Sequence, residues 1–161
     1  MFQIACNSNL PFNEQYVLWG LRLWHLGHRT DSHVMAELHA GFLGGGAPNA
    51  AQSLARMMMI LVNSCHRQPQ VNCVCVDTVS DDENLILNSI AQCQIGNSGV
   101  LHFWLDELAP PPIVTLLLPL LEKFADDLID GSIFMSRERI YLGSGLMVCA
   151  SPKQESIKTF L

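Results

Sequence analysis

The stretch NLPFNEQYVLWGLRLWHLGHR, residues 9–29, decides the fold that this sequence predicts. On a helix with about 100° per residue, its polar side chains fall into one narrow strip, and apolar side chains cover most of the remaining circumference. A surface helix of a globular protein has a single apolar stripe, whereas a helix that is apolar on most sides is buried on several sides. We therefore expect residues 12–29 to form the central helix of a bundle.

Two glycines, Gly20 and Gly27, lie on one side of this expected helix. Glycine inside a helix is less favourable than alanine by roughly 0.5–1 kcal/mol, so each glycine needs a compensating advantage. A notch in the helix surface that allows a second backbone to approach closely would be such an advantage. The sequence therefore predicts that the glycine side of the helix lies at a close packing contact, within the bundle or between subunits.

Helical periodicity and helix-ending residues divide the chain into about six helices. We expect them near residues 12–29, 32–43, 47–66, 80–94, 98–108 and 112–130. Ser80 and Glu83 have the spacing of a capping box at the start of the fourth helix. Residues 71–79 are rich in β-branched side chains and are expected to form a short strand or an extended connector. Residues 131–161 form a less regular tail, in which residues 139–142 and 146–150 could pair as a short β-hairpin before a brief terminal helix.

Length and composition indicate one mainly α domain, residues 1–161, that associates with another chain. A chain of 161 residues can bury its own core. Charged residues make up only 15% of it, against roughly 25% in typical soluble domains. This leaves more apolar residues than a lone domain of this size usually hides. Homo-oligomerisation, most commonly as a symmetric dimer, would explain the excess, and a protein partner is the alternative.

Charge and hydropathy argue against two other classes of partner. The net charge of −6, with no run of Lys and Arg, is unfavourable for nucleic acid, whose phosphates require clustered cations. The most apolar run, residues 113–121, is about half as long as a membrane span and contains Pro119.

Residues 1–9 lack the features of a secretory signal. The six cysteines are too few for a disulfide scaffold, so we expect a cytoplasmic protein with free thiols.

A cluster of histidines is the first candidate site. Four of the six histidines, His25, His28, His33 and His39, lie within fifteen residues, and Glu37 lies one helical turn after His33. Neutral imidazole is a common ligand of zinc, iron, copper and nickel, so these five residues could bind a transition metal or a cofactor. The sequence lacks the signature of a zinc hydrolase and the Glu-x-x-His pairs of a di-iron bundle. The alternative interpretation is a solvated helix corner with His28 at the edge of the core.

The second candidate is the pair Cys73 and Cys75. Side chains two residues apart on a strand face the same side, so these thiols could form a redox pair or bind a soft transition metal. The Cys-x-Cys spacing does not match the usual zinc knuckle, and no second pair follows downstream. The alternative is that both cysteines behave as small apolar residues of the core.

The sequence shows no catalytic motif, and this favours a non-enzymatic protein. The three glycines at positions 44–46 lack the preceding strand and the Lys-Ser/Thr of a phosphate-binding loop. Ser144, between two glycines, lacks the strand–turn–helix context of a nucleophile elbow. We therefore expect a binding or regulatory protein that acts through apolar helix faces as a homodimer, with a transition-metal or cofactor-binding protein as the alternative. The expected interface consists of Trp19, Gly20, Trp24, Gly27, Met57, Met58 and Met59, where the adaptable methionines suit irregular contacts.

Overall fold

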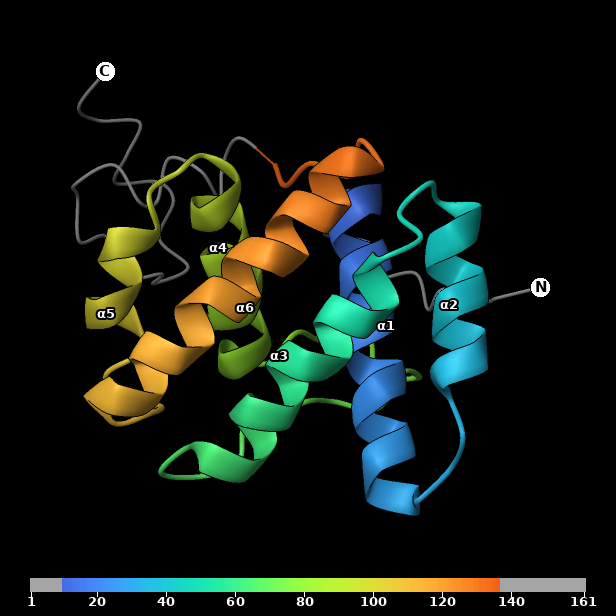
Figure 1. Ribbon diagram of the computed structural model, residues 1–161. Coiled ribbons are helices and arrows are strands. Elements are labelled where there is room, and N and C mark those ends of the chain that lie inside the picture. The colour runs from blue at the N-terminus through green and yellow to red at the C-terminus, as the bar shows by residue number, and fades with distance from the viewer. Residues whose placement is uncertain (1–9, 137–161) are drawn as a thin grey trace, which may run out of the picture.

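The protein is described by a computed structural model over residues 10–136, and all regular structure in that range is helical (Figure 1). The helices are α1 (Phe12–Thr30), α2 (Met35–Gly44), α3 (Ala50–Ser64), α4 (Asp81–Gln94), α5 (Leu101–Trp104) and α6 (Pro111–Asp130), with a 3₁₀ turn, η1 (Ser98–Val100), before α5. The predicted mainly α bundle of about six helices is confirmed for these residues. The predicted hairpin and terminal helix fall on residues 139–161, outside the described residues.

The helices share one continuous core. The α6 helix runs diagonally across the bundle and packs on α3 and α4, while α1 contacts α2, α3 and α4 (Figure 1). Every residue from position 17 to position 25 of α1 is buried. The prediction that this helix is covered on several sides is confirmed. None of the helices within residues 10–136 combines the length and the apolar character that crossing a bilayer requires.

Side chains of the same chain occupy the glycine side of α1. A Cβ atom on Gly20 would lie 2.8 Å from Cζ of Phe42 on α2, and a Cβ atom on Gly27 would overlap with the side chain of Val34. The close packing expected at these glycines is present. At Gly20 the side chains of Phe42 and Leu54 make this contact, whereas at Gly27 the backbone carbonyl oxygen of Ser32 also lies 3.2 Å from the Cβ position, beside the Val34 side chain.

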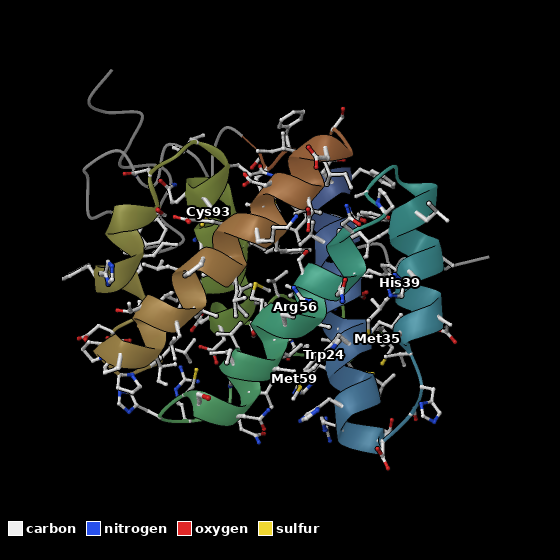
Figure 2. The ribbon with its side chains drawn as sticks, in the orientation of Figure 1. Trp24, Met35, His39, Arg56, Met59 and Cys93 are labelled. Atoms are coloured by element: carbon white, nitrogen blue, oxygen red, sulfur yellow. The ribbon has the colours of Figure 1, made fainter. Side chains whose placement is uncertain are left out.

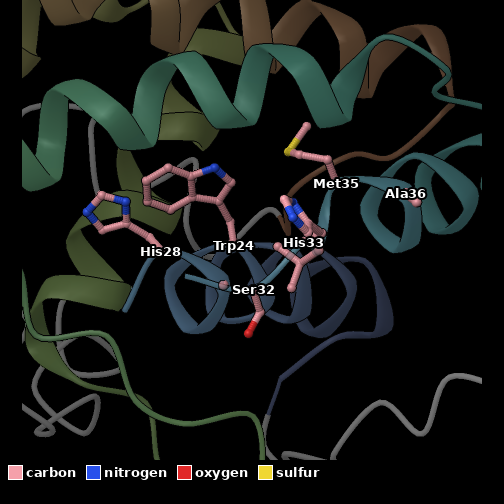
Figure 3. A pocket seen from close by; sticks show the side chains of 8 residues that line it. Trp24, His28, Ser32, His33, Met35 and Ala36 are labelled. Carbon is pink, nitrogen blue, oxygen red and sulfur yellow. The ribbon is translucent and has the colours of Figure 1, made fainter. Parts of the chain in front are cut away.

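Most of the residues expected at a subunit interface lie in the core of the single chain. Met57 and Met58 are fully buried, and Trp19 and Trp24 are at most 8% exposed. Trp24 rises from α1 toward α3 (Figures 2 and 3). Gly20 and Gly27 are buried too, so Met59, at 46% exposure, is the one residue of the seven with a side chain at the surface. The other six stabilise the fold of one chain and offer little surface to a partner.

The junction between α1 and α2 differs from the prediction. We expected the second helix to begin near residue 32, but residues 31 and 32 close the first helix instead. Asp31 adopts a left-handed conformation with φ of 53°, and the Ser32 N–H donates to the Gly27 carbonyl at 3.0 Å. This is the usual way to satisfy the free carbonyls at a helix end. The next helix therefore begins only at Met35 and has no side-chain cap.

Pro119 does not interrupt the last long helix. The α6 helix runs without a break from Pro111 to Asp130. Pro119 cannot donate to the Thr115 carbonyl one turn earlier. Both residues are exposed, so water can satisfy that carbonyl.

Candidate functional site

A pocket of about 230 Å³ opens at the corner between the end of α1 and the start of α2 (Figure 3). The turn that closes α1 forms one wall, and the first residues of α2 form another. Its lining consists of Trp24, Gly27, His28, Ser32, His33, Val34, Met35 and Ala36. The left-handed conformation of Asp31 is what folds these two walls toward each other.

The pocket combines an apolar interior with two imidazoles. Trp24 stacks on His28, with ring centroids 5.0 Å apart and an angle of 11° between the ring planes. Met35 and Val34, both half-buried, add a thioether and a branched aliphatic group. His28 and His33 are exposed, so their ring nitrogens remain open to solvent. Such a mixture is typical of ligand pockets, in which apolar surface supplies contact and a few polar groups supply orientation.

The predicted histidine cluster is only partly assembled. The structure brings His28 and His33 to the pocket, whereas Glu37 and His39 are exposed residues farther along α2. Figure 2 labels His39 on this helix. His25 is buried, and this burial, aided by the charges of Arg29 and His28, lowers the pKa of its ring below the usual range. Across the part of the chain that the structure describes, no three His, Cys, Asp or Glu side chains are arranged to hold a metal. The metal or cofactor site at these five residues therefore stays a prediction without structural support.

A buried ion pair joins α1 to α4. Arg22 Nε donates to Glu83 Oε1 at 2.8 Å, and Nη2 donates to Oε2 at 3.0 Å. The two side chains are 3% and 0% exposed. Glu83 also completes the predicted capping box, because its Oε2 accepts from the Ser80 N–H at 2.9 Å while Ser80 Oγ accepts from the Glu83 N–H at 3.1 Å. The capping-box prediction is confirmed.

The same ion pair holds the loop of residues 65–80. Arg22 donates to the carbonyls of Val76 and Thr78 at 2.6 and 2.7 Å, and Glu83 Oε1 accepts from the Asn72 N–H at 2.8 Å. Backbone groups that are partly withdrawn from water need partners, and here charged side chains take the place of a neighbouring strand. Residues 71–79 therefore form a connector and no strand, but the connector is not extended throughout, because a turn lies at residues 73–76.

A second ion pair fixes the beginning of this loop. Arg67 donates to both carboxylate oxygens of Asp82, at 2.6 and 2.8 Å, and the Gln70 N–H donates to the same carboxylate at 2.6 Å. The hydrogen bonds from Arg67 lower the pKa of Asp82. The Arg67 side chain is 54% exposed, so this pair, unlike the first, lies at the surface.

We call residues 65–80, which the two ion pairs hold, the clamped loop. Cys73 and Cys75 lie at the exposed tip of this loop, with their Sγ atoms 3.3 Å apart. The Val76 N–H donates to the Cys73 carbonyl at 3.0 Å, so residues 73–76 form a turn. The backbone N–H and the thiol of Cys75 hydrogen-bond to the Cys73 sulfur and lower the pKa of Cys73, while donating this hydrogen bond raises the pKa of Cys75. The alternative that both cysteines are core residues is wrong. Binding of a soft metal by the pair stays a prediction.

Comparison with known protein families, characterised proteins and solved structures finds no match to this chain. The corner pocket and the clamped loop are therefore the two features from which a function can be inferred. The pocket offers contact and hydrogen bonding, and the loop offers paired thiols.

Proposed function

We propose that this is a non-enzymatic binding or regulatory protein whose corner pocket takes an apolar side chain of a protein partner. The lining of the pocket carries the proposal. Trp24, Val34 and Met35 provide apolar contact, and the ring nitrogens of His28 and His33 can hydrogen-bond to the partner's backbone. A volume of about 230 Å³ is below the roughly 300–1,000 Å³ of pockets for drug-sized ligands, and it suits one large side chain better than a cofactor.

The hydrogen bonding around the pocket favours binding over catalysis. Ser32 is the one hydroxyl of the lining, and its Oγ bonds to Thr30 Oγ1 at 2.7 Å. A nucleophilic serine instead needs a hydrogen bond to a base such as imidazole. The four described cysteines are free, which agrees with the cytoplasmic location that we propose with this function.

We further propose that the protein is a homodimer, formed at the end of the bundle where α1 begins and α2 ends. Three large apolar side chains are exposed there, Phe12 at 68%, Leu43 at 64% and Phe134 at 53%. Their elements are joined at this end: Phe12 stacks on Tyr16, the Tyr16 hydroxyl donates to the Gly41 carbonyl, and Asn13 Nδ2 donates to the Phe134 carbonyl at 3.1 Å. A second copy covering the same patch would hide apolar surface that the low charge content leaves uncovered.

Filling the pocket is expected to abolish binding of an aromatic probe. N-acetyl-tryptophanamide serves as a stand-in for a partner's aromatic side chain, and its binding is followed by ¹H–¹⁵N NMR. We expect shifts centred on the Trp24 indole N–H and on the amides of Met35 and Ala36. The Ala36→Trp variant places a second indole in the pocket and should weaken binding by about tenfold or more, a difference of about 1.4 kcal/mol.

The matched control is Ala40→Trp, which adds the same indole one helical turn further along α2, at an exposed position outside the pocket lining. We expect this variant to bind the probe as the wild type does. Equal loss of binding in both variants, or shifts centred away from the pocket, would contradict the proposal.

Sedimentation equilibrium is expected to show a mass of two 17.9 kDa chains at micromolar concentration. Leu43→Asp should shift the protein to the monomer, because it buries a charge in the proposed contact. Leu116→Asp is the matched control, since Leu116 is also exposed, at 59%, but lies in the first part of α6, toward the opposite end of the bundle. A monomeric wild type, or a dimer that Leu43→Asp leaves intact, would refute this contact.

A further inference from the structure

The exposed cysteine pair has no role in the proposed pocket. Cys73 and Cys75 both reach solvent, whereas Cys65 is half-buried and Cys93 is buried. Burial raises the pKa of Cys93 to about 12, which keeps that thiol unreactive. Among the four described cysteines, these two are therefore the ones that a reagent in solution can reach freely.

The geometry of the turn allows the two sulfurs to bond. Alternate Cα atoms of an extended strand lie about 6.8 Å apart, at the upper end of the roughly 4.4–6.8 Å that disulfides span. The hydrogen bond from the Val76 N–H to the Cys73 carbonyl closes a turn and brings the two residues closer than in a strand. The sulfurs lie 3.3 Å apart and need to approach by only about 1.3 Å to reach a disulfide length of about 2.0 Å.

The buried ion pair holds this turn in place from both sides. The Asn72 N–H, directly before Cys73, donates to Glu83 Oε1, and the Val76 carbonyl, directly after Cys75, accepts from Arg22 Nη1. Fixing both ends removes conformations in which the two thiols are far apart. Such preorganisation raises the effective concentration of one thiol at the other.

The two thiols are also unequal. Cys75 Sγ donates its hydrogen to Cys73 Sγ, so a negative charge on Cys73 is stabilised by its neighbour. The thiolate is the attacking species in disulfide exchange, which assigns the attacking role to Cys73 and the resolving role to Cys75. A disulfide across so short a loop is exposed and strained, and disulfides of this kind are labile ones that serve catalysis or regulation.

We propose that Cys73 and Cys75 form a thiol–disulfide exchange site that reduces small disulfides such as glutathione disulfide. The Cys73 thiolate attacks one sulfur of the substrate, the substrate S–S bond breaks, and the first leaving thiolate takes a proton from water. Cys75 then loses its proton to solvent and attacks the Cys73 sulfur of the mixed disulfide, which releases the second thiolate. The protein thiols lose two electrons in forming their disulfide, and the substrate gains two electrons and becomes two thiols.

The test follows the pair in the full reduced chain, equilibrated in glutathione redox buffers, quenched with acid and alkylated. Cleavage after Arg67 and before Asp77 releases residues 68–76, a peptide in which Cys73 and Cys75 are the only cysteines. We expect this peptide to lose two hydrogens and to carry neither alkylating reagent nor glutathione. The equilibrium constant for its oxidation should be at least about tenfold larger in the folded protein than in urea, because the clamp exists only in the folded state.

Two variants separate the roles of the thiols. Cys75→Ser should accumulate a mixed disulfide between Cys73 and glutathione, while Cys73→Ser should react more slowly at its remaining thiol. Cys65→Ser is the control and should leave the oxidation of the peptide unchanged. The proposal would be overturned if the wild type formed mixed disulfides with glutathione and no disulfide between Cys73 and Cys75. It would also be overturned if the equilibrium constant were the same in the folded and the urea-unfolded chain. The outcome does not depend on whether the corner pocket binds a partner.

Discussion

Replacing Glu83 with alanine is expected to lower the free energy of unfolding by about 3–5 kcal/mol, the cost of leaving one partner of a buried ion pair alone. The remaining Arg22 guanidinium is 3% exposed and cannot regain its hydration without opening the contact between α1 and α4. The change also removes the acceptor of the Asn72 and Ser80 N–H groups. Urea unfolding followed by circular dichroism measures the loss.

Asp82→Ala is the matched control for this prediction. Asp82 is the neighbouring residue on α4 and also binds an arginine, but Arg67 is 54% exposed and becomes solvated once its partner is gone. We therefore expect a loss of about 1–2 kcal/mol, mainly from the hydrogen bonds to the loop. The double variant Arg22→Met with Glu83→Leu removes both buried charges and should be more stable than Glu83→Ala. If Glu83→Ala costs no more than Asp82→Ala, the ion pair does not hold the loop as described.

Features that depend on short segments were predictable from the sequence. The burial of α1 follows from the distribution of its apolar residues, and the start of α4 follows from the spacing of Ser80 and Glu83. The buried ion pair was not predicted, because it joins residues that are 61 positions apart. One signal was present: Arg22 lies between Leu21 and Leu23 on a helix that is apolar nearly all round.

The sequence indicated which residues belong to the candidate sites, but it did not indicate the structure that surrounds those residues. The histidine cluster pointed to His28 and His33, yet the pocket beside them depends on the left-handed turn at Asp31. The same-side placement of Cys73 and Cys75 was expected of a strand, whereas their exposure comes from a loop that distant charges hold.

The sequence also could not show whether the six buried residues expected at a subunit interface pack within one chain or between two chains. A helix that is apolar on several sides can bury those sides against its own chain or against a partner, and periodicity does not distinguish the two cases. In the structure α1 buries these sides against its own chain, because α2, α3 and α4 all contact it.

The substitution Gly20→Leu is expected to destabilise the protein by about 3 kcal/mol or more, at the upper end of overpacking effects. The first atom of a new side chain would already lie 2.8 Å from Phe42 Cζ and 3.3 Å from Leu54 Cδ2. Phe42 cannot move aside easily, since it is fully buried and its ring centroid lies 5.4 Å from that of Tyr16 and 6.2 Å from that of Phe124. The α2 helix would have to shift away from α1.

Gly44→Leu is the control that separates this steric effect from the general effect of replacing glycine in a helix. Gly44 is the last residue of α2, and a Cβ atom there would meet no atom within 4 Å. Replacing this glycine should change stability by no more than about 1 kcal/mol, and in the stabilising direction, because leucine has the higher helix propensity. Thermal unfolding should therefore separate the variants, with a melting temperature lower by about 6–12 °C for Gly20→Leu alone. Equal melting temperatures for the two variants would mean that α1 and α2 do not pack through the glycine side of α1.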